Sequence, residues 1–281
     1  MRPFLAFLSF PFLMLNTGCG GDAGTGTVVV TAWGEDYIEK GIPVAEFADG
    51  WSASFDTFLI VLGDVTFSNA DGGQASMSGL TLYDLATPGP HAMGRSEPLE
   101  ATNWQSVGYR MAVATPDADV HASATEGTLT TMLDGGYSVY VEGSATNGTD
   151  TYAFRWGFTD SVRFDDCVDV GGGQETRGVV VTAGGAVEMQ LTIHGDHFFY
   201  DDLQSGDAAL RFENIAAADT DTDGEVTLAE LALVPLASLP ADNGPYGVGA
   251  ADANDLGAYM RSAVVALGHL NGEGHCRVTV E

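Results

Sequence analysis

Residues 56–64 read DTFLIVLGD, and the apolar run from Phe58 to Leu62 at their centre decides the fold class. Five consecutive apolar residues between polar or glycine-containing ends are typical of a strand that is buried on both faces. Further strands are expected where β-branched and aromatic residues gather, at residues 28–33, 80–85, 107–113, 137–142, 152–158, 179–182 and 187–193. Strands of this number, separated by turn residues, predict a β-sandwich-like domain over residues 27–193.

The composition supports a turn-rich β protein. The 281 residues include 37 glycines, and 45% of the side chains are apolar, which is enough for one large or two modest domains with a core. Asn147-Gly148 lies between the strands expected at 137–142 and 152–158, and this dipeptide favours a tight hairpin turn. The four tryptophans could line a sugar-binding face, but in a β-sandwich they are more often core residues.

Residues 1–18 have the layout of a signal peptide, with one charge at Arg2 and then an apolar run from Pro3 to Leu15. This run is shorter than the roughly 20 residues that a membrane-spanning helix needs. Small residues stand directly before Cys19, and the segment resembles the lipobox of bacterial lipoproteins. Asn16 departs from that pattern, which has an aliphatic residue at this place, and an ordinary secreted protein is the alternative.

The lipobox resemblance implies that Cys19 is lipidated and becomes the new N-terminus. Residues 19–26 are rich in glycine and would form a flexible tether between the lipid and the folded domain. Gly20, in place of an aspartate after the cysteine, implies sorting to the outer membrane. The expected location is therefore the cell envelope, with the membrane contacted through the lipid anchor.

Two cysteines, Cys167 and Cys276, remain once Cys19 is assigned to lipid. In an oxidising compartment two remaining cysteines usually pair. We therefore predict a disulfide that ties the C-terminal tail to the middle of the chain. Free buried thiols or a metal site are the alternatives.

After Gly195 the pattern changes from strands to short helices. Apolar residues recur at helical spacing most clearly from Leu256 to Leu267, and Gly268 is expected to cap this helix. Shorter helices are expected at residues 208–217 and 228–234, and residues 276–280 are expected to return to the sheet as a strand. The overall prediction is a mainly β protein in which residues 194–281 form a helical subdomain.

Residues 219–230 read DTDTDGEVTLAE, a loop with the ligand spacing of a calcium site. The oxygen ligands expected at positions 1, 3, 5, 7, 9 and 12 are Asp219, Asp221, Asp223, the Glu225 backbone carbonyl, Thr227 and Glu230. Gly224 at position 6 permits the sharp turn, and Glu230 can bind through both carboxylate oxygens.

This loop and its flanks resemble the EF-hand family, with agreement at every ligand position. The resemblance implies Ca²⁺ rather than Mg²⁺, because a bidentate residue at position 12 favours a larger coordination number. The sequence contains no second loop with this spacing, so the resemblance implies a site that stabilises structure and not a paired calmodulin-like sensor. An acidic surface turn before a helix is the alternative.

Four of the six histidines fall in two short C-terminal segments that contain glycine, so the backbone can bend to bring ligands together. The candidate ligands are His194, His197, His269 and His275. Imidazoles with a nearby carboxylate suit zinc, copper or iron. The alternative is a set of strand-end histidines bonded to backbone. His91 and His121 are scattered in expected loops and are assigned no role.

The formal charge of −29 disfavours nucleic acid as a partner, because such a surface repels phosphate. The sequence contains no nucleophile elbow, phosphate-binding loop or kinase signature, so no enzyme activity is expected. The main hypothesis is a calcium-binding envelope lipoprotein that acts as a binding or structural module. The alternative is an envelope protein that binds copper or zinc through its C-terminal histidines. The sequence specifies no protein or carbohydrate partner.

Overall fold

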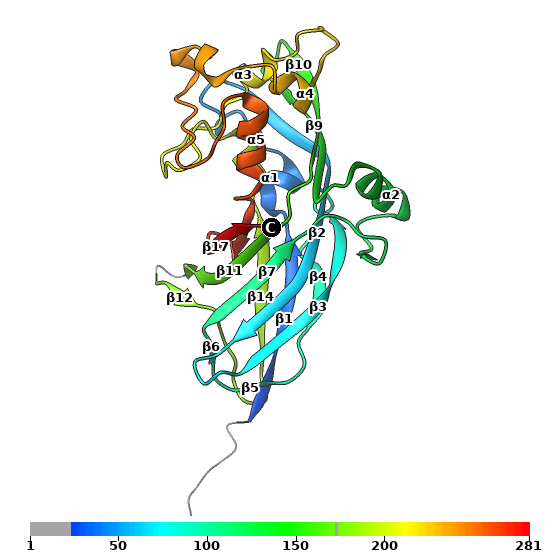
Figure 1. Ribbon diagram of the computed structural model, residues 1–281, viewed down its shortest axis with the longest axis vertical. Coiled ribbons are helices and arrows are strands. Elements are labelled where there is room, and N and C mark those ends of the chain that lie inside the picture. Colours follow the sequence, from blue (N-terminus) through cyan, green and yellow to red (C-terminus); the bar gives the residue numbers. More distant parts are fainter. Residues whose placement is uncertain (1–23, 172–173) are drawn as a thin grey trace, which may run out of the picture.

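The computed structural model describes residues 24–171 and 174–281 (Figure 1). The signal peptide, Cys19 and most of the tether predicted above lie outside these residues. The chain is mainly β, as predicted. Its longer strands are β1 (Thr25–Trp33), β2 (Ser52–Ser68), β3 (Gln74–Asp84), β4 (His91–Arg95), β7 (Ser106–Met111), β9 (Val139–Thr146), β10 (Thr151–Phe158), β11 (Val162–Asp169), β14 (Ala186–Ile193) and β17 (His275–Val280).

Short strands and helices complete the fold. The short strands are β5 (Leu99–Glu100), β6 (Asn103–Trp104), β8 (Asp119–Val120), β12 (Thr176–Arg177), β13 (Val179–Val180), β15 (Glu225–Thr227) and β16 (Gly268–Leu270). The α-helices are α1 (Glu35–Lys40), α2 (Glu126–Gly135), α3 (Glu213–Ala216), α4 (Leu228–Leu231) and α5 (Leu256–Val264). The 3-10 helices are η2 (Gly195–Phe199), η3 (Leu236–Ser238) and η4 (Ala241–Asn243). Strand β1 begins at Thr25, inside the segment predicted as tether.

Two mixed sheets share the main hydrophobic core (Figure 1). The smaller sheet has the order β16-β14-β1-β4, and its central pair, β1 and β14, is parallel. The larger sheet follows β12-β11-β7-β2-β9-β10-β15. In addition, β3 pairs with β2, and β17 pairs with β11. Buried side chains of both sheets, such as Val30, Leu191 and Leu62, belong to the same core cluster.

The run from Phe58 to Leu62 lies in β2 and is buried on both faces, as predicted. Phe58 and Ile60 belong to the main core, whereas Leu59 and Val61 belong to a second cluster that includes side chains of α2. Helix α2 was not predicted. It begins at a capping box formed by Thr125 and Thr128, which satisfies backbone donors at the first turn. The hairpin predicted at Asn147-Gly148 is present, since it connects the antiparallel strands β9 and β10.

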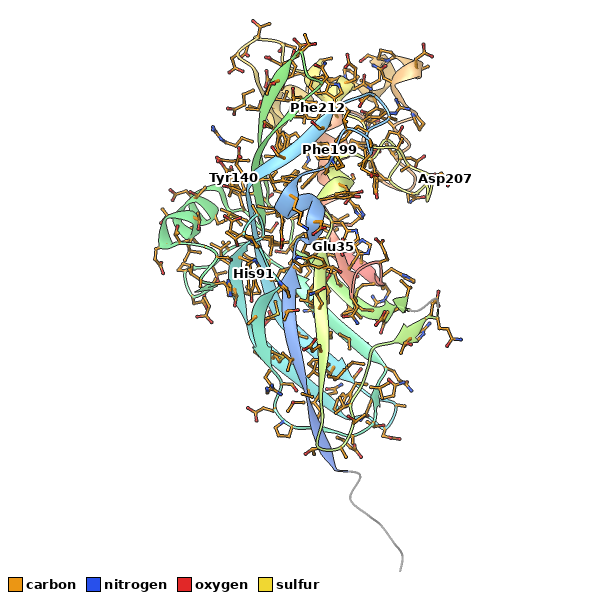
Figure 2. All side chains as sticks on the ribbon, turned by 180° about the vertical axis from the view of Figure 1, so that it is seen from behind. Glu35, His91, Tyr140, Phe199, Asp207 and Phe212 are labelled. Atoms are coloured by element: carbon orange, nitrogen blue, oxygen red, sulfur yellow. A yellow bond between two sulfur atoms is a disulfide. The ribbon has the colours of Figure 1, made fainter. Side chains whose placement is uncertain are left out.

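Three of the four tryptophans, Trp51, Trp104 and Trp156, are buried, which confirms the core interpretation for them. Trp51 and Trp156 belong to an aromatic cluster with Phe199 and Phe212, which are labelled in Figure 2. No helix of the described residues is long and apolar enough to span a membrane.

The prediction of a separate C-terminal helical subdomain is wrong. Strand β15 pairs with β10, β16 pairs with β14, and β17 pairs with β11, so residues 194–281 are built into both sheets. The helix predicted at 256–267 is present as α5, but the two shorter ones are reduced to single turns in α3 and α4. Gly268 is the first residue of β16 and does not cap α5, which ends at Val264 with Val265 as its C-cap residue.

The predicted disulfide between Cys167 and Cys276 is present. It links β11 to β17 beside an irregularity in their pairing, between the Asp165–Arg277 and Val168–His275 pairs. Cys167 is fully buried. The bond therefore fixes the last strand, and the hairpin that precedes it, to the core of the larger sheet.

Candidate metal centres

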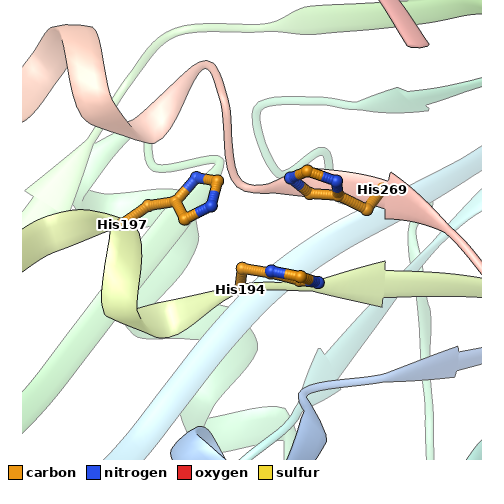
Figure 3. A group of neighbouring side chains, drawn as sticks. All are labelled: His194, His197 and His269. Atoms are coloured by element: carbon orange, nitrogen blue, oxygen red, sulfur yellow. The ribbon is translucent and has the colours of Figure 1, made fainter. Parts of the chain in front are cut away.

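Three histidines meet where β14 ends, beside β16 (Figure 3). His194 directly follows β14, and His197 lies in the 3-10 helix η2 that comes next. His269 is on β16, opposite Thr192 of β14. The backbone N–H of His194 also donates to the Leu267 carbonyl at 3.0 Å. Pairing of the two strands therefore brings together histidines that are far apart in the sequence.

Two glycines make this approach sterically possible. A Cβ atom on Gly268 would lie 2.5 Å from Oη of Tyr109, and one on Gly195 would lie 2.6 Å from a methylene of Ile38. Both distances are shorter than side chains tolerate. Because Gly268 has no side chain, Tyr109 can also donate a hydrogen bond to the His269 carbonyl at 3.1 Å. The glycines beside His194 and His269 are thus required for packing.

The three imidazoles are close enough to share one ion. One ring nitrogen from each of His194, His197 and His269 lies within 4.8 Å of the other two. The ring centroids of His194 and His269 are 4.2 Å apart, and the ring of His197 lies 5.2 Å from His269 and 5.4 Å from His194. This geometry brings together three of the four histidines predicted as ligands.

Several ring nitrogens in this group are buried without a hydrogen-bond partner: Nε2 of His194 and both nitrogens of His269. His194 itself is only 6% exposed. Buried polar atoms in proteins nearly always have a partner, so unpaired atoms of this kind require an explanation. For His269, a metal ion bound by the ring would supply one, because imidazole nitrogens are among the commonest metal ligands.

Burial also sets the protonation state of the group. Burial, reinforced by the neighbouring imidazoles, lowers the pKa of His197 to about 3 and that of His269 to about 4. Both rings are therefore neutral at neutral pH and keep a lone pair that can bind a cation. For His194, burial lowers the pKa, but the carboxylate of Glu35 outweighs that effect and the pKa is raised overall.

An open cavity of about 700 Å³ reaches this group from the surface. His197, His269 and His275 line it together with polar side chains that include Tyr200 and Gln204. His275, the fourth predicted ligand, is exposed and lies outside the close group of three. The cavity gives solvent and small solutes access to the histidine group.

His91 and His121 lie together and are not scattered as expected. Their ring centroids are 5.0 Å apart, and the ring of His121 also lies 5.0 Å from that of Tyr83. His91 is buried, and its Nε2 lies 3.1 Å from the Thr87 carbonyl. Among the described residues no third ligand completes a metal group here, so this pair is explained by packing.

The predicted calcium loop brings its first three carboxylates together. Asp219, Asp221 and Asp223 each place one oxygen within 4.8 Å of the other two. The turn depends on Thr222 and Gly224, which both have positive φ angles, and Oδ2 of Asp219 accepts the Gly224 N–H at 3.0 Å. The loop therefore brings together the first three of the six positions predicted as ligands.

The second half of the loop is held by hydrogen bonds of its own. Thr227 caps α4. Its backbone N–H and its hydroxyl donate hydrogen bonds to Oε2 of Glu230 at 2.9 and 2.8 Å. The other oxygen, Oε1 of Glu230, is buried and unpaired, as is Oδ1 of Asp219. Glu225 and Thr227 delimit β15. Glu230, the last residue of the loop, is thus outside the tight group of three aspartates.

The neighbouring carboxylates affect the pKa of Asp221. A backbone hydrogen bond from Asp223 lowers the pKa of Asp221, but desolvation and the charges of Asp223, Glu230 and Asp219 outweigh it, so the pKa is raised. Like charges at this spacing are stabilised by a bound cation. The structure therefore shows an acidic group that could hold Ca²⁺, without identifying the ion.

Comparisons with known proteins identify no family for this chain. No family model matches it, and no curated protein matches it. Among solved structures, MbnP from Methylosinus trichosporium is similar to it with a TM-score of 0.31 and 9% sequence identity, covering 62% of this chain and 77% of that chain. A likeness this distant supports no conclusion about function, which has to be argued from the site itself.

Proposed function

We propose that this protein is an envelope metal-binding protein that holds a copper or zinc ion with His194, His197 and His269. The observation that carries the proposal is the convergence of three imidazoles, one directly after β14, one on the 3-10 helix η2 and one on β16, of which His269 has both ring nitrogens buried and unpaired. Removing such nitrogens from water without a partner costs free energy. A bound ion recovers that free energy, because it replaces the lost hydrogen bonds with coordinate bonds.

The ligand chemistry favours copper or zinc over harder ions. Three imidazoles suit zinc and copper, whereas calcium and magnesium prefer oxygen ligands. Three protein ligands also leave a coordination position for water or an exchanging ligand. The cavity that ends at His197 and His269 gives access to this position. These features support a site that loads and releases its ion, as a carrier or store does.

We infer that the protein is attached to the envelope through Cys19, on the strength of the N-terminal pattern, and that it binds its ion without catalysing a reaction. Mass spectrometry of the N-terminal peptide tests the anchor. A diacyl or triacyl mass on Cys19 is expected, and an unmodified Cys19 in membrane-extracted protein would contradict it.

Elemental analysis of the protein purified from the cell envelope, without an affinity tag that binds metal, tests the metal proposal. We expect about one equivalent of copper or zinc per chain in the wild type. We expect none above background in His197→Ala, because two imidazoles hold these ions far more weakly than three. Wild-type protein that carries only calcium, or no metal at all, would contradict the proposal.

A second ion is proposed for the loop at residues 219–230, in a structural role. It is supported by the close approach of three aspartates and by the buried unpaired oxygens of Asp219 and Glu230. Calcium is preferred because the donors are all oxygens. Strand β15, which leaves the loop, pairs in parallel with β10 of the larger sheet, so an ordered loop would hold that edge in place.

Calcium removal is expected to destabilise the fold. A ligand at a hundredfold excess over its Kd stabilises the native state by about 2.7 kcal/mol. For a domain of this size, chelation should then lower Tm by roughly 5 to 10 °C. Glu230→Gln should reproduce much of this loss, and Asp223→Asn less, because an amide oxygen can still coordinate.

The measurement is thermal unfolding with calcium, with magnesium and with chelator. Glu126→Gln is the matched control, because Glu126 is an exposed acid at the start of α2, and it should respond to calcium as the wild type does. A wild-type Tm that is the same in all three conditions would show that the loop binds no stabilising ion.

A further inference from the structure

Glu35 lies beside the histidine group, although it is 159 residues before His194 in the sequence. Strands β1 and β14 are parallel, and Trp33 at the end of β1 pairs with Thr192. Parallel pairing brings the carboxyl ends of both strands to the same edge. Glu35, labelled in Figure 2, and His194 each follow this last pair by two residues, so the sheet itself places one next to the other.

The side chains of these two residues face each other. Oε2 of Glu35 is 3.5 Å from Nε2 of His194, in a geometry that is not aligned for a hydrogen bond. That nitrogen is buried and has no hydrogen-bond partner. The other carboxylate oxygen, Oε1 of Glu35, faces the turn at Gly272, where an added Cβ atom would lie 3.9 Å from it. A small rotation of the carboxylate would complete a hydrogen bond from the ring.

The backbone of Glu35 is unusual as well. Its φ angle is +56°, in the left-handed region that residues other than glycine rarely adopt. The preceding residue, Gly34, has a φ angle of −89°, so the left-handed conformation falls on Glu35 and not on the adjacent glycine, which would adopt it at less cost. A strained conformation of this kind persists only when surrounding contacts hold it, and such residues gather at functional sites. Here the strain positions a carboxylate against one imidazole of the proposed metal group.

We propose that Glu35 is a positioning residue for the metal site, which accepts a hydrogen bond from Nε2–H of His194 and so leaves Nδ1 of that ring to bind the ion. The inference rests on the proposed function of the histidine group. Glu35 is outside the group whose ligand atoms lie within 4.8 Å of one another in the described part of the chain, so it acts through His194 and not as a fourth ligand.

The chemical consequence concerns affinity. A carboxylate that accepts the N–H of a metal-bound histidine fixes the tautomer and the ring orientation, and it raises the basicity of the ligating nitrogen. Loss of such a partner typically lowers metal affinity by about 10- to 100-fold. It also supplies a negative charge beside a site whose ligands are imidazoles, which favours a divalent ion.

Two substitutions test the inference while preserving the fold. Glu35→Gly removes the carboxylate and is free of strain at a positive φ angle. Glu35→Gln keeps an oxygen that can accept the same hydrogen bond but removes the charge. Asp36→Asn is the matched control, because Asp36 is the next acid on α1 and is exposed, where it pairs with Lys40. Zinc affinity is measured by competition with a chromophoric chelator.

We expect Glu35→Gly to weaken zinc binding by about 10- to 100-fold with one ion still bound, Glu35→Gln to weaken it less, and Asp36→Asn to match the wild type. A wild type that binds zinc together with a Glu35→Gly variant of equal affinity would overturn the role of Glu35 and leave the metal site intact. A wild type that binds no zinc would overturn the proposed function instead.

A second readout does not require the metal. Long-range proton–nitrogen NMR of the metal-free protein reports which nitrogen of His194 carries the proton. We expect the Nε2–H form in the wild type and in Asp36→Asn, and a mixture of forms in Glu35→Gly. The same tautomer populations in the wild type and in Glu35→Gly would overturn the proposed contact. A change of tautomer that accompanies the loss of affinity separates positioning from general loss of structure.

Discussion

Replacing His269 by alanine is expected to abolish stoichiometric binding of copper or zinc at micromolar protein concentration. His269 contributes one of three converging imidazoles, and both of its ring nitrogens are buried and unpaired. Loss of a residue that only supports a metal ligand already lowers affinity by about 10- to 100-fold. Loss of a ligand itself should exceed this, so we expect more than about a hundredfold decrease in affinity.

The measurement is a titration of metal-free protein with zinc in the presence of a competing chelator. His275→Ala is the matched control, because His275 lines the same cavity but lies outside the group of three. It should retain one equivalent of bound zinc. Calcium-dependent stability should be unchanged in both variants, which shows that they are folded. Equal loss of zinc in both variants would mean that the group of three does not define the site.

The second large effect is expected from the disulfide. Cys167 and Cys276 are separated by 109 residues, and closing a loop of about 100 residues stabilises a fold by about 4.7 kcal/mol in the chain-entropy account. The double substitution Cys167→Ala and Cys276→Ala should therefore lower the free energy of unfolding by roughly 4 to 5 kcal/mol. Chemical denaturation measures this, and reduction of the wild type should give a similar loss while leaving the variant unaffected.

Loss of the disulfide should also weaken the metal site. The bond fixes β17 to β11, and the hairpin before β17 holds Leu270 and Gly274 by backbone hydrogen bonds of 2.8 and 3.0 Å. His269 precedes this hairpin. We expect zinc affinity to fall in the double variant even though every ligand is retained. A double variant with wild-type stability and affinity would show that the β11–β17 ladder alone holds this segment.

Several features of the site could be predicted from the sequence because they depend on local spacing. The acidic loop at residues 219–230 is recognisable from its carboxylates and from Gly224, since all of them lie within one short segment. The pairing of Cys167 with Cys276 followed from an even number of remaining cysteines. His194 and His197 are three residues apart, so they share one short segment wherever it lies in the fold.

Other features depend on strand pairing between distant segments, which local patterns do not report. The approach of His269 to His194 requires β16 to pair with β14. Gly268 was expected to cap a helix and no strand was predicted there, although β16 begins at this residue. Glu35 carried no signal at all, because its role arises from the parallel register of β1 and β14. The same pairings explain why the C-terminal segment joins the sheets and forms no separate subdomain.

X-ray absorption spectroscopy of the zinc-loaded protein tests the central claim most directly, because it counts the ligands around the ion. We expect multiple-scattering features of three imidazoles, with nitrogen at about 2.0 to 2.1 Å and no sulfur shell. In His269→Ala any remaining zinc should show fewer imidazoles. A spectrum of the wild type dominated by oxygen ligands, with one imidazole or none, would contradict a metal site formed by His194, His197 and His269.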